Sequence, residues 1–389
     1  MVILLYVQWR KRRFRCGLAG LFLGIFCFFA CVLPSHGAET GLSVSAKSAA
    51  LFNASDGSLL WEKNAQQTLP MASTTKIMTA LLTLEQAAIE DRVVEITEEM
   101  VRVEGSSMGL RAGDRLRLSA LAAGMLSTSG NDAANAAAYA LDGSLPAFAQ
   151  RMNARAEELG LSHTHFVTPS GLDDDAHYTT AEDLGKLACA AMQNPSFAAI
   201  VSQKSVQVTF EQPAQTRTYK NHNKLLSQYA GCIGVKTGYT EKAGRCLVSC
   251  AQRDGVRLVA VTLHAPDDWA DHTAMLDYGF SLLRSVSLND SAFACTLPVV
   301  GADRETVSIT GSEGESVVIP VDAVLQREVL LPRFLYAPLE EGQVVGCVLY
   351  RVGNTVVGQT ALTASAVSSA EAPAQTFWDR ISAFFAHSG

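Results

Sequence analysis

Apolar and polar positions recur with different periods along the chain and so predict where strands and helices lie. Two short apolar runs, 43–52 and 58–62, flank a turn signal at 53–57 and predict a β-hairpin. From Ser73 onward the apolar residues recur at three- and four-residue spacing, which indicates a helix with one buried face.

Further helices and strands follow before residue 285. The helix-prone stretches are 120–141, interrupted at 127–131, then 145–159 and 181–191, and the strand-like stretches are 234–237, 245–250 and 256–264. Strands at both ends of residues 38–285, with helices between them, predict an α/β domain whose sheet joins segments distant in sequence.

The last part of the chain has a different pattern. Residues 288–364 alternate apolar with polar or β-branched side chains, and Gly353-Asn354 is a hairpin turn between two such runs. This region predicts a small all-β domain, followed by a linker at 365–376. Bulky apolar residues at helical spacing in 377–389 then predict an amphipathic helix that associates with a membrane, with packing onto the β domain as the alternative.

The first 37 residues have the pattern of a secretory signal peptide. A cluster of Lys and Arg between residues 10 and 15 precedes the apolar run 16–33, and small residues follow Pro34. We expect cleavage after Gly37, and an uncleaved membrane anchor is the alternative, because about 18 apolar residues can just span a bilayer. In both cases the rest of the chain lies outside the cytoplasm.

The exported part of the chain is acidic. The whole chain has 31 Lys and Arg against 38 Asp and Glu, a net charge of −7, and five of the basic residues lie in the signal segment. The remainder therefore has 26 basic and 38 acidic residues, a balance of −12. Such a balance argues against a nucleic-acid-binding protein, which would present a basic face.

Six cysteines follow the signal segment: Cys189, Cys232, Cys246, Cys250, Cys295 and Cys347. An even number in an exported protein permits disulfides, for example Cys232 with Cys246 or Cys250, and isolated buried thiols are the alternative. No pair has the CxxC spacing of a zinc site, so no structural metal is expected.

Candidate chemistry begins with Ser73 and Lys76 at the start of the first predicted helix. Their three-residue spacing places both side chains on one face, within hydrogen-bond reach. A serine hydroxyl is a weak nucleophile until a base removes its proton, and a lysine becomes that base when burial or a neighbouring cation lowers its pKa. A Ser-x-x-Lys pair also occurs by chance in exposed helices, so it needs further support.

Two further motifs supply that support. Ser129 and Asn131 lie where the second helical stretch breaks, and Lys236-Thr237-Gly238 ends a predicted strand. We expect Ser129 to carry a proton between the first lysine and the leaving group, and Asn131 to hold that lysine and the substrate amide. Lys236 would lower the pKa of the first lysine and, with Thr237, bind a substrate carboxylate, while Gly238 lets a substrate backbone approach the strand.

In this order and at these separations, the three motifs resemble those of the low-molecular-mass penicillin-binding proteins, the serine-type D-alanyl-D-alanine carboxypeptidases. Blocks around the motifs are similar as well, at 70–80, 129–134, 166–173, 234–240 and 242–244. The resemblance implies a penicillin-binding/β-lactamase-like α/β fold, with an antiparallel sheet and a helical cluster in the catalytic domain.

The same resemblance implies an activity. The enzyme would remove the terminal D-alanine from peptidoglycan stem pentapeptides through an acyl-enzyme on Ser73, limiting cross-linking at the outer face of the cytoplasmic membrane. The backbone N–H groups of Ser73 and Tyr239 would form the oxyanion hole. β-Lactam antibiotics would acylate the same serine, and neither a metal nor a cofactor is implied. Some members have His in place of Tyr239 or Ser170, which leaves the deacylation rate and the substrate preference open.

Other functions remain as alternatives. A class A β-lactamase shares two motifs but needs a glutamate that activates the deacylating water, and residues 165–175 contain no such pattern. A non-catalytic wall-binding protein with the same fold would have no need of an intact Ser73 and Lys76. A Ser-His-Asp hydrolase is not indicated, because the histidines are scattered and no GxSxG elbow surrounds a serine.

Overall fold

The computed structural model describes residues 41–370, so the predicted signal peptide (1–37) and terminal helix (377–389) lie outside the described residues. The helices are η1 (Ala72–Thr75, a 3-10 turn), α1 (Lys76–Ile89), α2 (Glu98–Val101), α3 (Leu118–Thr128), α4 (Asn131–Asp142), α5 (Leu145–Glu158), α6 (Ala181–Gln193), α7 (Pro195–Val201), α8 (Leu225–Gln228) and α9 (Asp268–Leu282). The strands are β1 (Ser48–Asn53), β2 (Leu59–Lys63), β3 (Val93–Glu95), β4 (Arg115–Arg117), β5 (Ser205–Phe210), β6 (Gln215–Lys220), β7 (Cys232–Thr240), β8 (Gly244–Arg253), β9 (Val256–Leu263), β10 (Leu283–Val286), β11 (Ala294–Val300), β12 (Thr306–Gly311), β13 (Val317–Pro320), β14 (Leu325–Leu330), β15 (Leu335–Tyr336), β16 (Gln343–Val352) and β17 (Thr355–Ala364).

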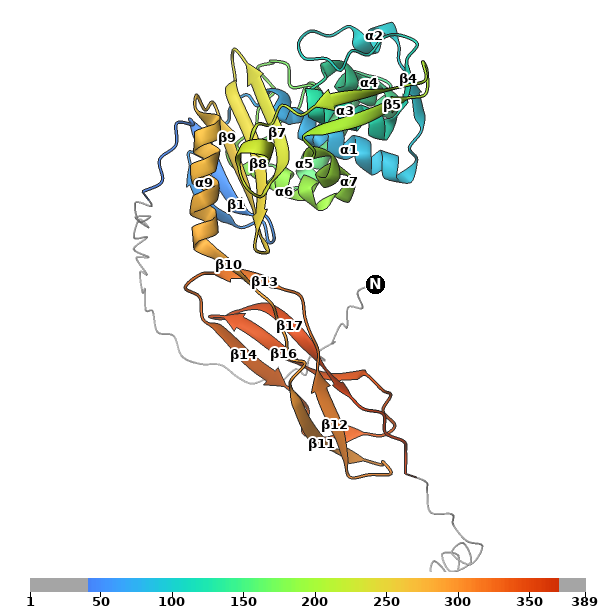
Figure 1. Cartoon of the computed structure of the whole chain (residues 1–389), viewed down its shortest axis with the longest axis vertical. Coiled ribbons are helices and arrows are strands. Elements are labelled where there is room, and N and C mark those ends of the chain that lie inside the picture. Colours follow the sequence, from blue (N-terminus) through green and yellow to red (C-terminus); the bar gives the residue numbers. More distant parts are fainter. Residues whose placement is uncertain (1–40, 371–389) are drawn as a thin grey trace, which may run out of the picture. The chain divides into compact units, whose positions relative to one another are not determined.

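A five-stranded antiparallel sheet, in the order β2-β1-β9-β8-β7, forms the centre of the α/β region (Figure 1). β1 and β2 form the predicted N-terminal hairpin, and β1 also pairs with β9 along its length. The first strands of this region therefore lie beside the last ones, as the sequence pattern predicts. The order leaves β7, which carries Lys236-Thr237-Gly238, at an open edge of the sheet.

The helical segment that was predicted to start at Ser73 begins differently. Residues 72–75 form a 3-10 turn, and the α-helix α1 starts only at Lys76. Ala72 has a φ of +48°, a conformation that residues other than glycine rarely adopt. Ser73 therefore belongs to a tight and strained turn rather than to a regular helix.

The second predicted helix consists of two helices. α3 ends at Thr128, Ser129 adopts the left-handed conformation with a φ of +61°, and α4 begins at Asn131. A left-handed residue terminates an α-helix, so the break expected at 127–131 is present. It separates Ser129 and Asn131 from the regular hydrogen bonding of either helix interior.

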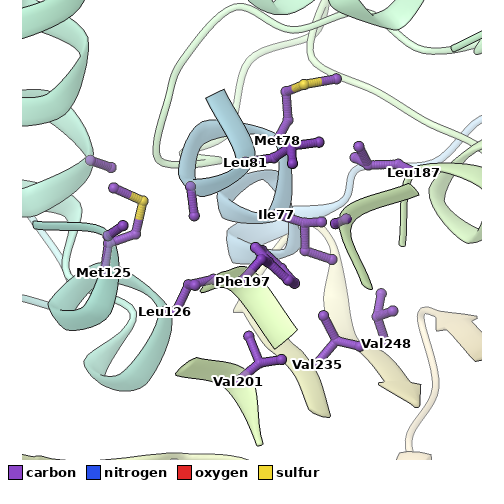
Figure 2. Close-up of a cluster of buried hydrophobic side chains, with 14 of the residues drawn as sticks. Ile77, Met78, Leu81, Met125, Leu126, Leu187, Phe197, Val201, Val235 and Val248 are labelled. Atoms are coloured by element: carbon purple, nitrogen blue, oxygen red, sulfur yellow. The ribbon is translucent and has the colours of Figure 1, made fainter. Parts of the chain in front are cut away.

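Apolar side chains of α1 pack between the other helices and the sheet (Figure 2). The labelled members of this cluster come from α1, α3, α6, α7, β7 and β8 and are Ile77, Met78, Leu81, Met125, Leu126, Leu187, Phe197, Val201, Val235 and Val248. Full burial of one such side chain contributes roughly 1.5–3 kcal/mol. This packing fixes the start of α1, where Ser73 and Lys76 lie.

Several elements were not predicted from the sequence. β5 and β6 form a hairpin, and α9 packs through Met275 and Leu276 against residues of β1, β8 and β9. Residues 294–364 contain a six-stranded sheet in the order β14-β16-β17-β12-β11-β15, in which the expected turn at Gly353-Asn354 joins β16 to β17. The predicted α/β class with an antiparallel sheet and a C-terminal β region is confirmed.

The six cysteines between residues 41 and 370 are free thiols. Cys232 pairs with neither Cys246 nor Cys250, because its partner across the β7-β8 ladder is Ala251. Burial raises the pKa of the Cys246 thiol to about 12, so this thiol stays protonated at neutral pH. Of the two alternatives left open by the sequence, isolated thiols are therefore the one observed.

Two buried histidines predict that the fold loses stability in acid. His272 lies between Ser249 Oγ (2.5 Å) and Thr262 Oγ1 (2.9 Å), and burial lowers its pKa to about 3. Burial also lowers the pKa of His177 to about 4. Unfolded histidines titrate at about 6.5. The unfolded state therefore binds more protons below that pH, and the free energy of unfolding falls as the pH drops from about 6.5 towards 4.

We expect the denaturant midpoint, followed by circular dichroism, to be lower at about pH 4.5 than at about pH 7.5. Replacing His272 by glutamine removes one of the two groups and should reduce that difference. Replacing the exposed His163 by glutamine is the matched control and should leave the difference between the two midpoints unchanged. Equal pH dependence in all three proteins would contradict this account.

Candidate active site

The three sequence motifs meet beside the edge strand β7. Ser73 Oγ lies 2.9 Å from Lys76 Nζ, although the two residues belong to the 3-10 turn and to α1. Asn131 Oδ1 lies 2.7 Å from the same Nζ, and Lys236 Nζ lies 3.0 Å from Ser129 Oγ. Residues separated by more than a hundred positions are thus connected through two lysine side chains.

The amine of Lys76 has three oxygen neighbours. Ser170 O at 2.6 Å and Asn131 Oδ1 at 2.7 Å can only accept hydrogen bonds. The orientation of the Asn131 amide is fixed, because its Nδ2 donates to Glu104 O. A neutral amine has two N–H bonds and one lone pair. When the two N–H bonds point to these acceptors, the lone pair is left for the proton of the Ser73 hydroxyl.

The surroundings of Lys76 favour this neutral amine. The side chain is fully buried, and this burial is the largest cause that lowers its pKa well below that of an ordinary lysine. The charge of Lys236 lowers it further, while Asp132 acts in the opposite direction. Burial also lowers the pKa of Lys236 to about 7. The site therefore contains two lysines whose charged forms are disfavoured near neutral pH.

Gly238 brings β7 against the serine turn, residues 71–75. A Cβ atom on this glycine would lie 3.1 Å from Met71 O and from the backbone nitrogens of Ser73 and Thr74. A larger residue would therefore displace the turn. The sequence-based interpretation assigned Gly238 to the approach of a substrate, and the structure adds a second reason, the close approach of the strand to Ser73.

A cleft of about 300 Å³ opens at Ser73. It is lined by Ser73, Ser106, Ser129, His222, Lys224, Thr237, Gly238, Tyr239, Arg245, Asp268 and Trp269. Tyr239 is 66% exposed, whereas Lys76, Asn131 and Lys236 are buried and contact the lining residues. All eight residues that the sequence singled out therefore come together at one site.

One wall of the cleft is a loop that the sequence-based interpretation did not include. Asp132, the residue after Asn131, is buried and accepts several hydrogen bonds from this loop. The groups that donate to its carboxylate are Ser107 Oγ, Met108 N and Leu110 N. These bonds hold Ser106 at the cleft. An acidic residue beside the motif is visible in the sequence, but its partner loop is not.

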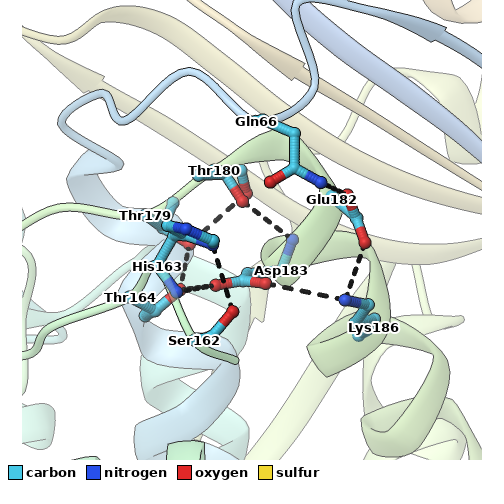
Figure 3. A network of polar contacts seen from close by, with 9 residues as sticks. All are labelled: Gln66, Ser162, His163, Thr164, Thr179, Thr180, Glu182, Asp183 and Lys186. Atoms are coloured by element: carbon cyan, nitrogen blue, oxygen red, sulfur yellow. Dashed lines mark hydrogen bonds and ion pairs between the residues drawn. The ribbon is translucent and has the colours of Figure 1, made fainter. Parts of the chain in front are cut away.

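The loop at 162–180 lies on another side of the site and is held by a polar network at the start of α6 (Figure 3). Asp183 Oδ2 accepts hydrogen bonds from His163 N at 2.7 Å and from Thr164 Oγ1 at 2.9 Å. The same loop supplies the carbonyl group of Ser170 to the buried lysine amine. A backbone carbonyl has no signature in residue types, so this contact could not be predicted from the sequence.

Fold and site together define a class of protein. A serine and a lysine share one turn at the start of a helix beside an antiparallel sheet, and within residues 41–370 no histidine is hydrogen-bonded to either. This combination is typical of penicillin-binding serine enzymes and not of the histidine-dependent serine hydrolases. The chain belongs to the D-alanyl-D-alanine carboxypeptidase family, whose model matches residues 35–267.

Relatives cover nearly the whole chain. It is similar to D-alanyl-D-alanine carboxypeptidase DacF of Bacillus subtilis, with 29% identity over 91% of this chain and 94% of the relative. Similarity to DacC of Escherichia coli is 32% identity over 89% and 90%. Among solved structures, DacD from Francisella tularensis has a TM-score of 0.60 at 25% identity, covering 85% of this chain and 95% of that one. The Streptomyces K15 DD-transpeptidase has a TM-score of 0.59 at 34% identity, covering 62% and 98%. The predicted fold and the serine-type carboxypeptidase class are confirmed.

Proposed function

We propose that Ser73 is the nucleophile and Lys76 its general base in a D-alanyl-D-alanine carboxypeptidase that trims peptidoglycan stem pentapeptides. One observation carries the proposal. The amine of Lys76 is buried, has two oxygen acceptors for its N–H bonds, and lies 2.9 Å from Ser73 Oγ. A lysine in that state can accept a proton at neutral pH. Removal of the terminal D-alanine limits cross-linking of the wall.

Acylation uses both lysines. Ser73 Oγ attacks the carbonyl carbon of the penultimate D-alanine while its proton passes to Lys76, and the backbone N–H groups of Ser73 and Tyr239 donate to the oxyanion. The C–N bond to the terminal D-alanine then breaks. The leaving nitrogen takes a proton from Ser129. The sequence motifs predict that this proton comes from Lys76, but Ser129 Oγ is hydrogen-bonded to Lys236 Nζ, so we propose that the charged form of Lys236 supplies it. The products are an ester on Ser73 and free D-alanine.

Hydrolysis of the ester restores the site. A water oxygen attacks the ester carbonyl, and one of its protons returns through Ser129 to Lys236. Ser73 Oγ leaves with the proton that Lys76 held since acylation. Both lysines regain their starting states, and the shortened peptide departs as a carboxylic acid.

Substrate recognition follows from the remaining groups. Thr237 and the charged form of Lys236 bind the terminal carboxylate of the peptide. Asn131 uses one N–H for Glu104 O and keeps the second for a substrate carbonyl. The open edge at Gly238 leaves room for an extended substrate backbone beside β7.

The proposal is tested by incubating the purified protein with a stem pentapeptide and, separately, with a labelled penicillin. We expect stoichiometric release of D-alanine and slow turnover of the covalently bound drug. Fast hydrolysis of the drug without release of D-alanine would instead indicate a β-lactamase. Absence of both labelling and release would exclude both enzymes and favour a wall-binding protein.

The enzyme acts outside the cytoplasm, where its substrate lies. We further propose that residues 377–389 attach it to the outer face of the cytoplasmic membrane as an interfacial helix. The bulky apolar residues at helical spacing in this segment are Phe377, Trp378, Ile381, Phe384 and Phe385. In the part of the chain between residues 41 and 370, no helix is long and apolar enough to cross a bilayer.

Deletion of residues 377–389 is expected to move the protein from the membrane pellet to the soluble fraction without changing its rate of D-alanine release. The double replacement Phe384→Ser and Phe385→Ser should do the same, because it removes two of the five bulky apolar residues of the stripe. Replacing the polar Asp379 and Ser382 by alanine is the matched control and should leave attachment intact. A deletion variant that stays in the pellet would contradict the proposal.

A further inference from the structure

His177 is a buried histidine whose bonding partners fix its protonation state. Its Nδ1 lies 3.0 Å from Val167 N and 3.3 Å from Thr168 N. Backbone N–H groups only donate, so Nδ1 accepts and the ring proton lies on Nε2. Nε2 lies 2.8 Å from Thr75 Oγ1 and donates to it, while the Thr75 hydroxyl donates its own proton to Ala72 O at 2.8 Å.

The imidazole therefore connects two segments that both contact Lys76. Thr75, at the end of the serine turn, directly precedes Lys76 in the chain. Val167 and Thr168 begin the segment 167–171, whose Ser170 carbonyl accepts from the Lys76 amine. The hydrogen bonds of the neutral His177 ring thus join the serine turn to this segment.

Close backbone packing makes the position of segment 167–171 sensitive to that connection. Gly171 lies so near the serine turn that a Cβ atom there would be 1.9 Å from Ala72 O. Pro169 O accepts from Thr79 Oγ1 of α1 at 2.6 Å, and Gly171 N donates to Thr168 Oγ1 at 3.0 Å. With such tight packing, a small shift of the segment displaces the Ser170 carbonyl and admits water.

We infer that His177 is a positioning residue, which holds segment 167–171 against the serine turn and thereby keeps the Lys76 amine dry and directed at Ser73. The inference rests on the proposed role of Lys76 as the base. It assigns no contact between His177 and the substrate, since the ring is 3% exposed and lies outside the cleft lining.

The charged groups around His177 are compatible with a neutral ring at the pH of catalysis. Burial is the main cause that lowers its pKa to about 4, and His165 and Lys76 lower it further, against an opposing effect of Asp174. A proton added at Nδ1 would face the two backbone N–H groups of Val167 and Thr168. The connection is therefore intact at neutral pH and is lost only in acid.

The inference predicts a change in the pH dependence of acylation, which a merely structural role would not produce. In His177→Leu, water reaches Lys76 and its pKa rises towards that of an ordinary lysine, because burial is the main cause of its depression. The acidic limb of the penicillin acylation rate should then move to higher pH by about one unit or more. The rate is measured per active site, by titration with labelled penicillin, so that loss of folded protein does not enter.

Three further variants make the test specific. Thr75→Val removes the other end of the connection with little change of volume and should shift the limb in the same direction. The double variant His177→Leu and Thr75→Val should shift it no more than His177→Leu alone, because both interrupt the same connection between the serine turn and segment 167–171. His177→Gln, which retains one donor and one acceptor, should restore part of the wild-type profile.

His165→Leu is the matched control from the same loop, at an exposed position, and should leave the profile unchanged. Unshifted profiles in both His177→Leu and Thr75→Val would overturn the inference, whatever their melting temperatures. Failure of the proposed function is distinguishable, because it would appear as absence of penicillin labelling in the wild-type protein itself.

Discussion

Replacing Ser73 by alanine is expected to abolish both penicillin labelling and D-alanine release, with a loss of at least about 10⁴-fold in kcat/KM for a pentapeptide. The acyl-enzyme is an ester on this hydroxyl, so neither step can begin without it. The fold should be unaffected, because Ser73 is only half-buried and Lys76 keeps its bonds to Asn131 and Ser170. Release of D-alanine is measured with a D-amino-acid oxidase assay, and labelling by gel fluorescence.

Ser106→Ala is the matched control, because this serine lines the same cleft and no step of the mechanism uses its side chain. We expect labelling and release near the wild-type level in this variant. Retained labelling in Ser73→Ala would assign the nucleophile to another residue. Loss of labelling in both variants would instead indicate that the cleft tolerates no substitution, and the loss in Ser73→Ala would then not identify Ser73 as the nucleophile.

Local spacing was sufficient to predict the pair formed by Ser73 and Lys76. Three positions along a helical turn bring two side chains together whatever the rest of the fold does, and this holds even though the turn is a 3-10 turn. The partnership of Ser129 with Lys236 is different in kind. These residues come from a helix junction and an edge strand, and the sequence motifs predict an exchange of Ser129 with Lys76 rather than with Lys236.

The groups missed from the sequence are those whose role depends on tertiary packing. Ser170 contributes a backbone carbonyl, which any residue type would supply. His177 is one of the scattered histidines to which the sequence assigns no role, and its burial alone would be compatible with an ordinary core histidine. Its hydrogen bonds to Thr75 and Val167 connect two segments that contact Lys76. Partners from such distant segments cannot be read from the periodicity of the sequence.

Some missed elements did carry a signal. β5 alternates between exposed and buried side chains, a period of two that is typical of a half-buried strand. The signal of α9 is weaker. Its buried face contains Asp268 and Asp271 as well as Met275 and Leu276, so the apolar stripe of an amphipathic helix is interrupted in the sequence. Polar groups buried with partners are common in large folds, and they weaken sequence patterns where tertiary contacts are dense.

Lys76→Met is expected to reduce the rate of penicillin acylation by about 10²–10⁴-fold at neutral pH, the usual contribution of general-base catalysis. Methionine has a similar volume and carries no charge, so the packing around this buried position is retained. In the wild-type protein, acylation needs the neutral amine, and burial together with Lys236 lowers the pKa of Lys76. The rate should therefore rise with pH through a limb well below the ordinary range of lysine, and this limb should be absent in Lys76→Met.

Lys224→Met is the matched control, because Lys224 also lines the cleft. Within residues 41–370, it forms no hydrogen bond with Ser73, Ser129 or either buried lysine. Its profile should keep the limb of the wild type. The charge of Lys236 is the second cause, after burial, that lowers the pKa of Lys76. A limb that persists unchanged in Lys76→Met would assign the base to Lys236, because burial lowers the pKa of Lys236 as well, to about 7.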